Sequence, residues 1–252
     1  MDASLPRVIA LAGVSNLRDL GGWRSADGRR VRFGRLFRSA ALSGLPPDAA
    51  PALAALGLRH VCDLRGIAEA RAAPDPMADL PHATYHALAI EPSVAAAMRA
   101  IAAAQGIATA ADMRAVMAAS YAAYATDWAA RYRALFAVLL DDASGPVLFH
   151  CSAGKDRTGF AAAMILAALD VPMDQIRADY LATNRLWRPD PMIAEGLDPA
   201  IASYMLGVHP ELLDAAFAAI DARGGFDAYA AAQLGLTPAR RAKLRETLLE
   251  AA

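Results

Sequence analysis

The stretch that decides the fold is Pro146-Val147-Leu148-Phe149-His150-Cys151-Ser152-Ala153-Gly154-Lys155-Asp156-Arg157-Thr158-Gly159. Its apolar run over residues 146–149 predicts a buried strand, and residues 160–169 predict a helix that follows at once. The small residues Ser152, Ala153 and Gly154 allow the backbone between strand and helix to curl tightly. Such a loop can aim successive N–H groups at an anion. We therefore expect an α/β fold in which residues 152–155 and Thr158 line an anion site.

Two side chains of this loop suit chemistry on a phosphoryl group. Five residues separate Cys151 from Arg157, whose planar guanidinium can grip two phosphoryl oxygens at once. A helix N-terminus and nearby cations favour the thiolate form of a cysteine, so we expect Cys151 to be ionised at neutral pH. Thr158 can donate its hydroxyl to that sulfur. We expect His150 to orient the loop through its ring nitrogens rather than to act as a base.

Composition narrows the classes of partner and compartment. The chain has 252 residues, with 25 Lys and Arg against 26 Asp and Glu and a net charge of −1. Proteins that bind the nucleic-acid backbone usually carry a clear cationic excess, so we expect no nucleic-acid partner. Two cysteines make no disulfide framework and favour a reducing compartment. Without a signal peptide or an uninterrupted apolar run of about 18 residues, we expect a cytoplasmic protein with no transmembrane segment.

The rest of the chain predicts alternating short strands and helices. The first forty residues indicate short strands and turns, residues 48–56 a helix, and residues 58–64 a buried strand that ends at Asp63. The later helices are predicted over residues 127–140, 174–184, 210–220, 226–234 and from Thr237-Pro238 onward, with a turn at 141–145. The sequence contains no linker long enough to separate two domains, so we expect one domain over residues 1–252.

Residues 92–124 are rich in alanine and carry apolar residues at helical spacing, with a break at Gly106. They predict two amphipathic helices. One interpretation makes them ordinary core helices. The other makes them a mobile cover over an active site, because methionine adapts to apolar ligands.

The passage HCSAGKDRTG, residues 150–159, resembles the Cys-loop protein tyrosine phosphatase superfamily, and within it the bacterial tyrosine or multi-specificity group. Residues 16–22, 34–39, 63–65 with Glu69, and 179–184 are similar to stretches of that group, in the same order. The resemblance implies a small, mainly parallel sheet with helices on both faces, and a helical lid at about residues 91–126. It also implies a phosphocysteine intermediate and neither a metal nor a cofactor.

The resemblance assigns the role of general acid to Asp156, inside the loop. Two other carboxylates compete with it. Asp63, at the end of a strand, could be an acid, but we favour it as a partner that fixes an arginine. Asp190 lies in a Trp-Arg-Pro-Asp run, which follows the cysteine rather than preceding it and has an intervening arginine, so we interpret that similarity as accidental.

Several other side chains have simple structural interpretations. We expect ion pairs of Arg18 with Asp19 and of Arg65 with Glu69. Cys62 lies in an apolar strand and is expected to be a core residue. For Lys155 two interpretations stay open: a solvated side chain, or a charge at the pocket mouth that favours multiply phosphorylated substrates. The other histidines, His60, His82, His86 and His209, show no spacing of metal ligands.

The predicted function is hydrolysis of phosphotyrosine, with phosphoserine and phosphothreonine as further substrates, and a phosphoinositide phosphatase stays open as the alternative. A nucleotide-binding P-loop is excluded, because Phe149 and Asp156 stand where its pattern requires Gly and Ser or Thr. A rhodanese-like sulfurtransferase and a phosphate-binding module without turnover are weaker alternatives. Phosphoryl chemistry fits Lys155 and Asp156 better than sulfur transfer does, and a thiol, an arginine and an acid are all present for turnover.

Overall fold

The computed structural model describes residues 7–91, 93–105, 108–141, 145–190, 192 and 195–251. Within this part of the chain the main sheet has six strands in the order β1-β2-β4-β7-β5-β6. In that order the strands are β1 (Arg7–Val8), β2 (Arg18–Asp19), β4 (Leu36–Ser39), β7 (Val147–His150), β5 (His60–Asp63) and β6 (Thr84–Ala87). The last four strands are mutually parallel. Strand β2 pairs antiparallel with both of its neighbours, β1 and β4. The expected small, mainly parallel sheet is confirmed.

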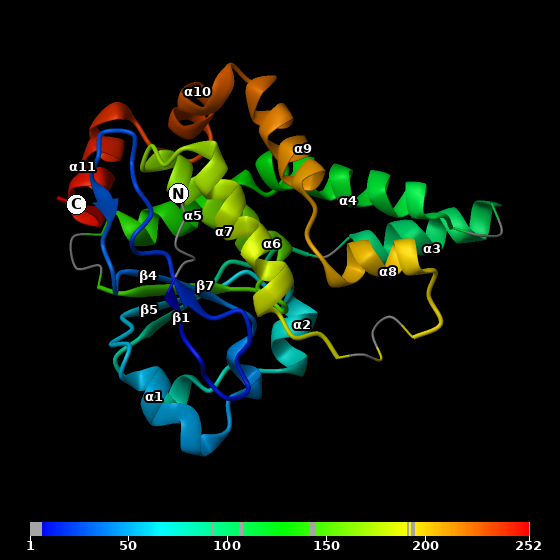
Figure 1. Cartoon of the computed structure of the whole chain (residues 1–252), viewed down its shortest axis with the longest axis horizontal. Coiled ribbons are helices and arrows are strands. Elements are labelled where there is room, and N and C mark those ends of the chain that lie inside the picture. Colours follow the sequence, from blue (N-terminus) through cyan, green and yellow to red (C-terminus); the bar gives the residue numbers. More distant parts are fainter. Residues whose placement is uncertain are drawn as a thin grey trace.

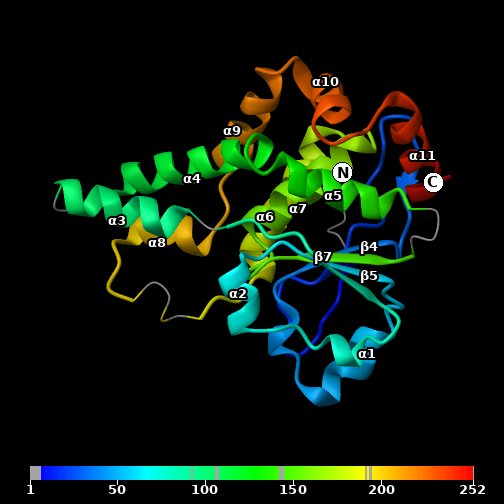
Figure 2. The same cartoon turned by 180° about the vertical axis from the view of Figure 1, so that it is seen from behind.

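Helices surround this sheet. They are α1 (Ala50–Ala54), α2 (Ile67–Ala72), α3 (Val94–Gln105), α4 (Ala110–Ala125), α5 (Ala129–Leu139), α6 (Asp156–Ala168), α7 (Met173–Leu186), α8 (Pro199–Leu206), α9 (Pro210–Asp221), α10 (Gly225–Ala232) and α11 (Pro238–Leu248). Short 3-10 turns are η1 (Leu42–Gly44), η2 (Pro47–Ala49) and η3 (Met77–Asp79), and β3 (Arg30–Val31) pairs with β8 (Leu249–Glu250). In Figures 1 and 2 the sheet lies between α1 on one side and α5, α6 and α7 on the other, while α3, α4 and α8 extend together away from it.

Strand β7 is central, and its position fixes where the loop begins. Its four residues are all buried, between β4 and β5. The register pairs His150 with Ser39 of β4 and with Asp63 of β5, so three strands end side by side. Ligands of open α/β sheets bind at this carboxyl edge. Cys151, the next residue, therefore starts the loop at the edge where a site is expected.

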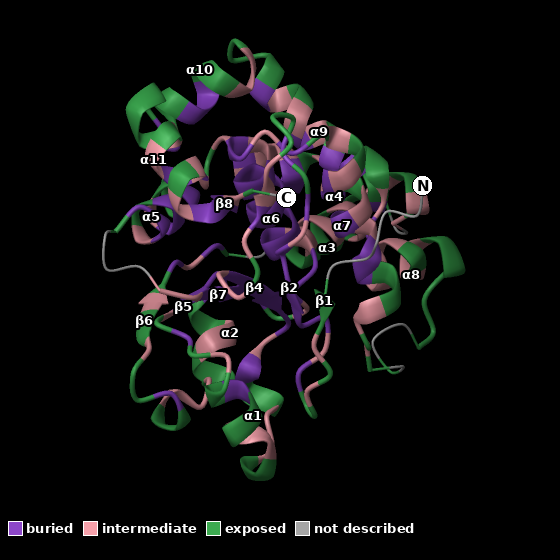
Figure 3. Cartoon of the chain, turned by 60° about the vertical axis from the view of Figure 1, so that its left-hand side comes forward, coloured by how far each residue is buried: buried purple, intermediate pink, exposed green. Residues whose placement is uncertain are grey.

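Helix α6 forms the centre of the larger hydrophobic core. Residues 157–166 are all buried, and Figure 3 shows the helix in the buried colour, whereas much of α1 and α10 is exposed. The run of small residues in its first half permits close packing, since a Cβ on Gly159 would meet the Tyr180 ring of α7 at 3.0 Å. A second, smaller cluster around Leu53, Val61 and Leu148 fills the opposite face of the sheet.

Some predicted boundaries need correction. The helix expected from Phe160 begins at Asp156, because the polar residues 156–158 form its first turn. Strand β6 and helices α2 and α8 have no counterpart among the predicted elements. The predicted break at Gly106 and the centre of the turn at 141–145 lie outside the described residues. None of the described helices is both long and apolar enough to cross a membrane.

Candidate active site

In the loop after β7, the carbonyl groups of residues 152–154 accept hydrogen bonds from residues outside the loop. The Ser152 carbonyl accepts from the N–H of Ala41 at 3.1 Å. Asn16 Nδ2 donates to the carbonyls of Ala153 and Gly154 at 3.3 and 2.8 Å, and Arg38 Nη2 donates to that of Gly154 at 2.8 Å. In a tight curl, carbonyls turned outward leave the N–H groups turned inward. In the described part of the chain nothing accepts the N–H groups of residues 152–155, so they are available to an anion.

Gly154 is required for this curl. Its φ is +64°, in the left-handed region that favours glycine. A Cβ at this position would lie 2.2 Å from the carbonyl oxygen of Ser39 and 2.4 Å from its carbonyl carbon. Strand β4 therefore approaches the loop so closely that only glycine fits, and the loop is packed against the sheet.

A buried ion cluster holds the two side chains that grip the loop. Asp179 of α7 accepts from Arg18 Nε at 2.8 Å and from Arg38 Nη1 at 2.6 Å, and all three are buried. Arg18 also donates from Nη1 to the backbone carbonyl of Asn16 at 3.0 Å. Burial and the neighbouring Arg38 lower the pKa of Arg18 to about 10 despite Asp179. Burial opposes ionisation of Asp179, yet the two arginines outweigh it and its pKa is lowered.

The two cysteines differ in their surroundings. Both are buried and free. Cys62 lies in β5, where burial raises its pKa to about 12, as a core residue would behave. Cys151 lies at the mouth of the loop, between the last strand residue and the open N–H groups. His150 directly before it is fully buried, with Nδ1 3.3 Å from the Cys151 carbonyl oxygen and Nε2 3.1 Å from Asp75 Oδ2.

Arg157 is held by Glu69, the third residue of α2. Its Nη1 and Nη2 donate to the two Glu69 carboxylate oxygens at 2.5 and 3.0 Å, and Nη1 also donates to the carbonyls of Leu64 and Ile90. Glu69 accepts in addition from Ser152 Oγ at 2.6 Å. Burial alone would raise the pKa of Glu69, but Arg157 and Ser152 lower it to about 2. Burial alone would lower the pKa of Arg157, but Glu69 and Cys151 raise it.

These contacts leave one edge of Arg157 for a ligand. A guanidinium carries five N–H groups. In the described part of the chain, Nε and the second N–H of Nη2 have no acceptor. This edge has the fork geometry that binds two oxygens of a phosphoryl group.

Asp156 is the first residue of α6 and lies at the same mouth. Its Oδ1 accepts from the Tyr121 hydroxyl of α4 at 2.9 Å, and its Oδ2 lies 3.6 Å from Lys155 Nζ. The carboxylate is about a quarter exposed, at 23%, so it can reach a bound ligand.

Lys155 is buried, with 4% of its surface exposed, so its solvated interpretation is wrong. Its Nζ donates to the carbonyls of Tyr204 and Met205, near the C-terminal end of α8, at 3.1 and 2.7 Å. It also lies 5.4 Å from the centre of the Trp187 ring. The loop is thereby tied to α8.

Asp63 holds Arg65 through its two carboxylate oxygens and also accepts from the Tyr85 hydroxyl at 2.7 Å. The carboxylates of Asp63 and Asp75, together with His150, place three metal-ligand atoms within 4.8 Å. However, Arg65 Nη2 lies 2.6 and 2.7 Å from those two carboxylates. A guanidinium thus supplies the positive charge there.

The other predicted side chains lie as follows. Thr158 is fully buried, and its hydroxyl has no hydrogen-bond partner in the described part of the chain. Asp190 is exposed and accepts from the N–H of Met192 at 2.9 Å, and it makes no hydrogen bond or ion pair to the described loop residues.

A hollow of about 200 Å³ opens beside the loop. Apolar and aromatic side chains of the described α3, α4, α5 and α8 region form much of its wall. Its lining comprises Glu91, Ser93, Val94, Met113, Met117, Ser120, Ala123, Tyr124, Trp128, Lys155, Asp156, Arg157, Tyr204 and Met205. Asp156 and Arg157 therefore both line a mainly apolar pocket.

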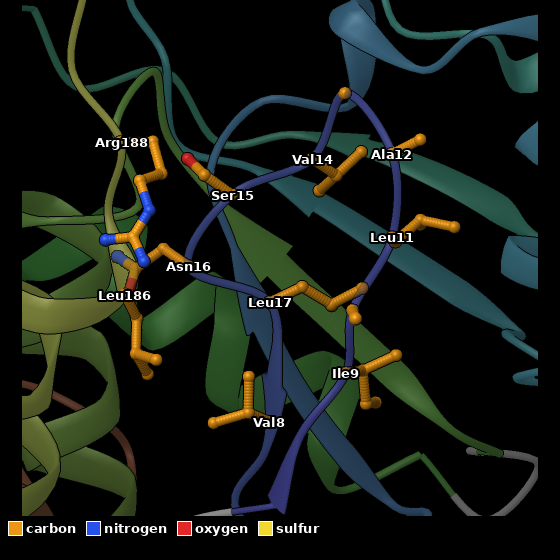
Figure 4. A pocket seen from close by; sticks show the side chains of 12 residues that line it. Val8, Ile9, Leu11, Ala12, Val14, Ser15, Asn16, Leu17, Leu186 and Arg188 are labelled. Atoms are coloured by element: carbon orange, nitrogen blue, oxygen red, sulfur yellow. The ribbon is translucent and has the colours of Figure 1, made fainter.

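A larger hollow of about 700 Å³ lies at the N-terminal loop, residues 8–17, with Leu186 and Arg188 on its other side. Figure 4 shows mainly aliphatic side chains around it, with Arg188 reaching in from the segment that follows α7. Its lining includes Asn16 but neither Asp156 nor Arg157, which both line the smaller hollow. The larger of these two hollows is therefore not the one beside the candidate catalytic residues, and we take the smaller hollow as the candidate substrate pocket.

Two predicted ion pairs are wrong. Arg18 binds Asp179 rather than Asp19, whose carboxylate instead accepts from the N–H groups of Gly21 and Gly34. Arg65 binds Asp63 and Asp75, and Glu69 binds Arg157. The reason is that the turn into α2 directs Glu69 back toward the loop.

Comparisons with known proteins agree with this geometry. The tyrosine phosphatase family matches residues 9–250. The chain is 40% identical over 240 residues to a candidate tyrosine-protein phosphatase of Cupriavidus necator, covering 86% of this chain and 80% of that protein. It is 33% identical over 279 residues to the triple specificity protein phosphatase PtpB of Mycobacterium tuberculosis, covering 95% and 98%. Crystalline TpbA of P. aeruginosa, at 18% identity, coverage of 77% and 96% and a TM-score of 0.32, is too distant to carry an argument.

The family match and these relatives define the class, a cysteine-dependent phosphatase. Because the match extends over nearly the whole chain, the chain belongs to the tyrosine phosphatase family. It is a hydrolase of phosphotyrosine, with a phosphorylated substrate and phosphate as product.

Proposed function

We propose that Cys151, Arg157 and Asp156 carry out the hydrolysis. The observation that supports this assignment best is the outward binding of three successive loop carbonyls, which leaves the N–H groups of residues 152–155 for the phosphoryl oxygens. Preorganised donors of this kind stabilise the charge that develops in a transition state without reorganising.

In the first step the Cys151 thiolate attacks phosphorus. The loop N–H groups and the free edge of Arg157 bind the non-bridging oxygens, and Asp156 gives its proton to the leaving oxygen. In the second step water attacks the phosphocysteine. Asp156, now ionised, accepts a proton from that water as the bond between sulfur and phosphorus breaks, and the thiolate returns.

Two further side chains support the nucleophile in this proposal. The Thr158 hydroxyl makes no hydrogen bond in the described part of the chain, to the Cys151 sulfur or to any other atom; in this proposal it turns to donate to that sulfur when the thiolate is released. His150, fully buried next to Asp75, fixes the start of the loop and takes no part in proton transfer.

The pocket supports a preference for aryl phosphates. Met113, Met117 and Trp128 line it, and such surfaces suit a phenyl ring better than a hydroxylated inositol ring. Phosphoserine, phosphothreonine and phosphoinositides are proposed as slower substrates. We also propose that residues 91–126 serve as a cover over the site within a single domain, and that the protein acts in the cytoplasm, where free thiols persist.

The assignment is tested by three variants. We expect Cys151→Ser to lose turnover but to bind vanadate or phosphate, and Arg157→Ala to lose both. Asp156→Asn should slow hydrolysis of phenyl phosphate about a hundredfold and that of p-nitrophenyl phosphate much less, because a good leaving group needs little protonation. Equal losses on the two substrates would contradict the acid role of Asp156.

The substrate range is tested by one panel of phosphopeptides and soluble phosphoinositides. The assays are run with a chelator present. We expect turnover to persist and kcat/KM to be highest for phosphotyrosine peptides. Activity that appears only when a metal is added would contradict the mechanism.

A further inference from the structure

Beyond the three proposed catalytic side chains, a chain of buried hydroxyls ends on the acid. The Tyr121 hydroxyl of α4 donates to Asp156 Oδ1 at 2.9 Å and lies 2.7 Å from the Tyr180 hydroxyl of α7. The Tyr180 hydroxyl in turn lies 3.5 Å from the carbonyl oxygen of His209. Both tyrosines are buried, with 0% and 1% of their surface exposed. These contacts link α4, α6 and α7, and Tyr180 also lies beside His209, the residue before α9.

The direction of these hydrogen bonds follows from proton counting. Each hydroxyl carries one proton. Because Tyr121 uses its proton for Asp156 Oδ1, the bond between the two phenols must be donated by Tyr180. Burial raises the pKa of both phenols well above the ordinary value, so both hydroxyls keep their protons at neutral pH.

The two oxygens of Asp156 are thus not equivalent. Oδ1 already accepts a short hydrogen bond. Oδ2 lies 3.6 Å from Lys155 Nζ, beyond hydrogen-bonding distance, and Lys155 donates to Tyr204 and Met205 instead. No donor of the described residues therefore occupies Oδ2. An acid that must hand a proton to a substrate needs that proton on its unoccupied oxygen.

We propose that Tyr121 is a positioning residue that keeps Oδ1 of Asp156 as an acceptor, so that Oδ2 carries the proton, delivers it to the leaving oxygen and takes one back from water. Tyr180 holds Tyr121 in the donating orientation. The inference rests on the proposed acid role of Asp156. It places the tyrosine of α4, a helix of the suggested cover, in direct contact with the chemistry, so the base of α4 must stay docked during turnover.

The test is the dependence of kcat/KM on the leaving group. In Tyr121→Phe the ring stays and only the hydroxyl is lost, so we expect kcat/KM to fall about tenfold for phenyl phosphate and less than about threefold for p-nitrophenyl phosphate. Tyr180→Phe should show the same selectivity with a smaller loss. Tyr229→Phe is the matched control, because Tyr229 is equally buried and its hydroxyl has no partner in the described part of the chain; it should match the wild type on both substrates.

A double-mutant cycle separates positioning from a general structural effect. In an Asp156→Asn background, Tyr121→Phe should cause little further loss on phenyl phosphate, since the acid is already absent. Equal losses on both substrates, or full additivity with Asp156→Asn, would overturn the inference. If Asp156→Asn itself lacks leaving-group selectivity, the proposed acid role fails first. If it has that selectivity and Tyr121→Phe does not, only the positioning role fails.

Discussion

Glu69 sets the orientation of the Arg157 guanidinium. It engages both Nη atoms of the guanidinium and also binds Ser152, so it connects α2 to two residues of the loop. With its pKa at about 2, Glu69 remains ionised from mildly acidic to alkaline pH. The edge of Arg157 that we propose binds the substrate is therefore held by a partner that stays ionised over this pH range.

Replacing Glu69 should loosen the orientation of the Arg157 guanidinium while leaving the arginine itself in place. We expect Glu69→Gln to lower kcat/KM for p-nitrophenyl phosphate about tenfold, because one charge-assisted hydrogen bond is lost. Steady-state kinetics measure this effect. The control is Glu246→Gln on the exposed face of α11, which should behave as wild type. An unchanged kcat/KM in Glu69→Gln would show that Arg157 needs no orientation by Glu69.

Among the elements, the strand, loop and helix around Cys151 were predictable because their signal is local. An apolar run, a set of small residues and a second apolar run follow one another directly. Helix α8 was missed because Ile201, Tyr204 and Met205 give it no clear polar face. Its position is nevertheless fixed by the bond from Lys155 to its last turn.

The supporting residues could not be predicted by the same reasoning. Asn16 and Arg38 lie in stretches that the family resemblance singled out, yet their partner Gly154 is more than a hundred residues away. Glu69 and Arg157 are 88 residues apart in sequence. Ion pairs inferred from neighbouring positions fail here because parallel strands bring remote segments together at one edge. Only the three-dimensional fold identifies which charges meet.

Lys155 should stabilise the docking of α8. In Lys155→Ala the two carbonyl acceptors near the end of that helix lose their cation, which interacts favourably with a helix C-terminus. We expect amide hydrogens of Pro199–Leu206 to exchange several times faster, as measured by hydrogen exchange with mass spectrometry. Lys243→Ala on α11 is the comparison. If exchange in α8 does not change, the contact does not hold the helix in place.

For the whole molecule, the buried cluster of Arg18, Arg38 and Asp179 is the main electrostatic support. Removing the single carboxylate leaves two buried guanidinium groups uncompensated. We expect Asp179→Asn to lower the free energy of unfolding by about 3–5 kcal/mol at pH 7, as measured by urea denaturation. The control is Asp214→Asn, whose partner Arg177 and own side chain are about half exposed; it should cost less than about 1 kcal/mol.

Acid should destabilise the fold in a defined direction. The pKa values of Asp63 and Asp179 are lowered in the native state, and that of Glu69 is about 2. The unfolded chain therefore binds more protons at low pH than the native protein does. The stability that these carboxylates contribute is fully present above their ordinary pKa values, 3.8 for Asp and 4.5 for Glu. It is lost as the pH falls through their lowered native pKa values. We expect the free energy of unfolding of the wild type to fall below about pH 4. The difference in free energy of unfolding between the wild type and Asp179→Asn should become smaller over the same range. A difference in free energy of unfolding that stays constant from pH 7 to pH 3 would contradict this prediction.

The central claim, that Cys151 takes the phosphoryl group, is tested most directly by rapid acid quench of the enzyme during turnover of p-nitrophenyl phosphate, followed by mass spectrometry of the peptide that contains Cys151. The account predicts a phosphorylated Cys151 in the wild type and none in Cys151→Ser. Hydrolysis at a normal rate with Cys151 never phosphorylated, or turnover retained by Cys151→Ser, would contradict it.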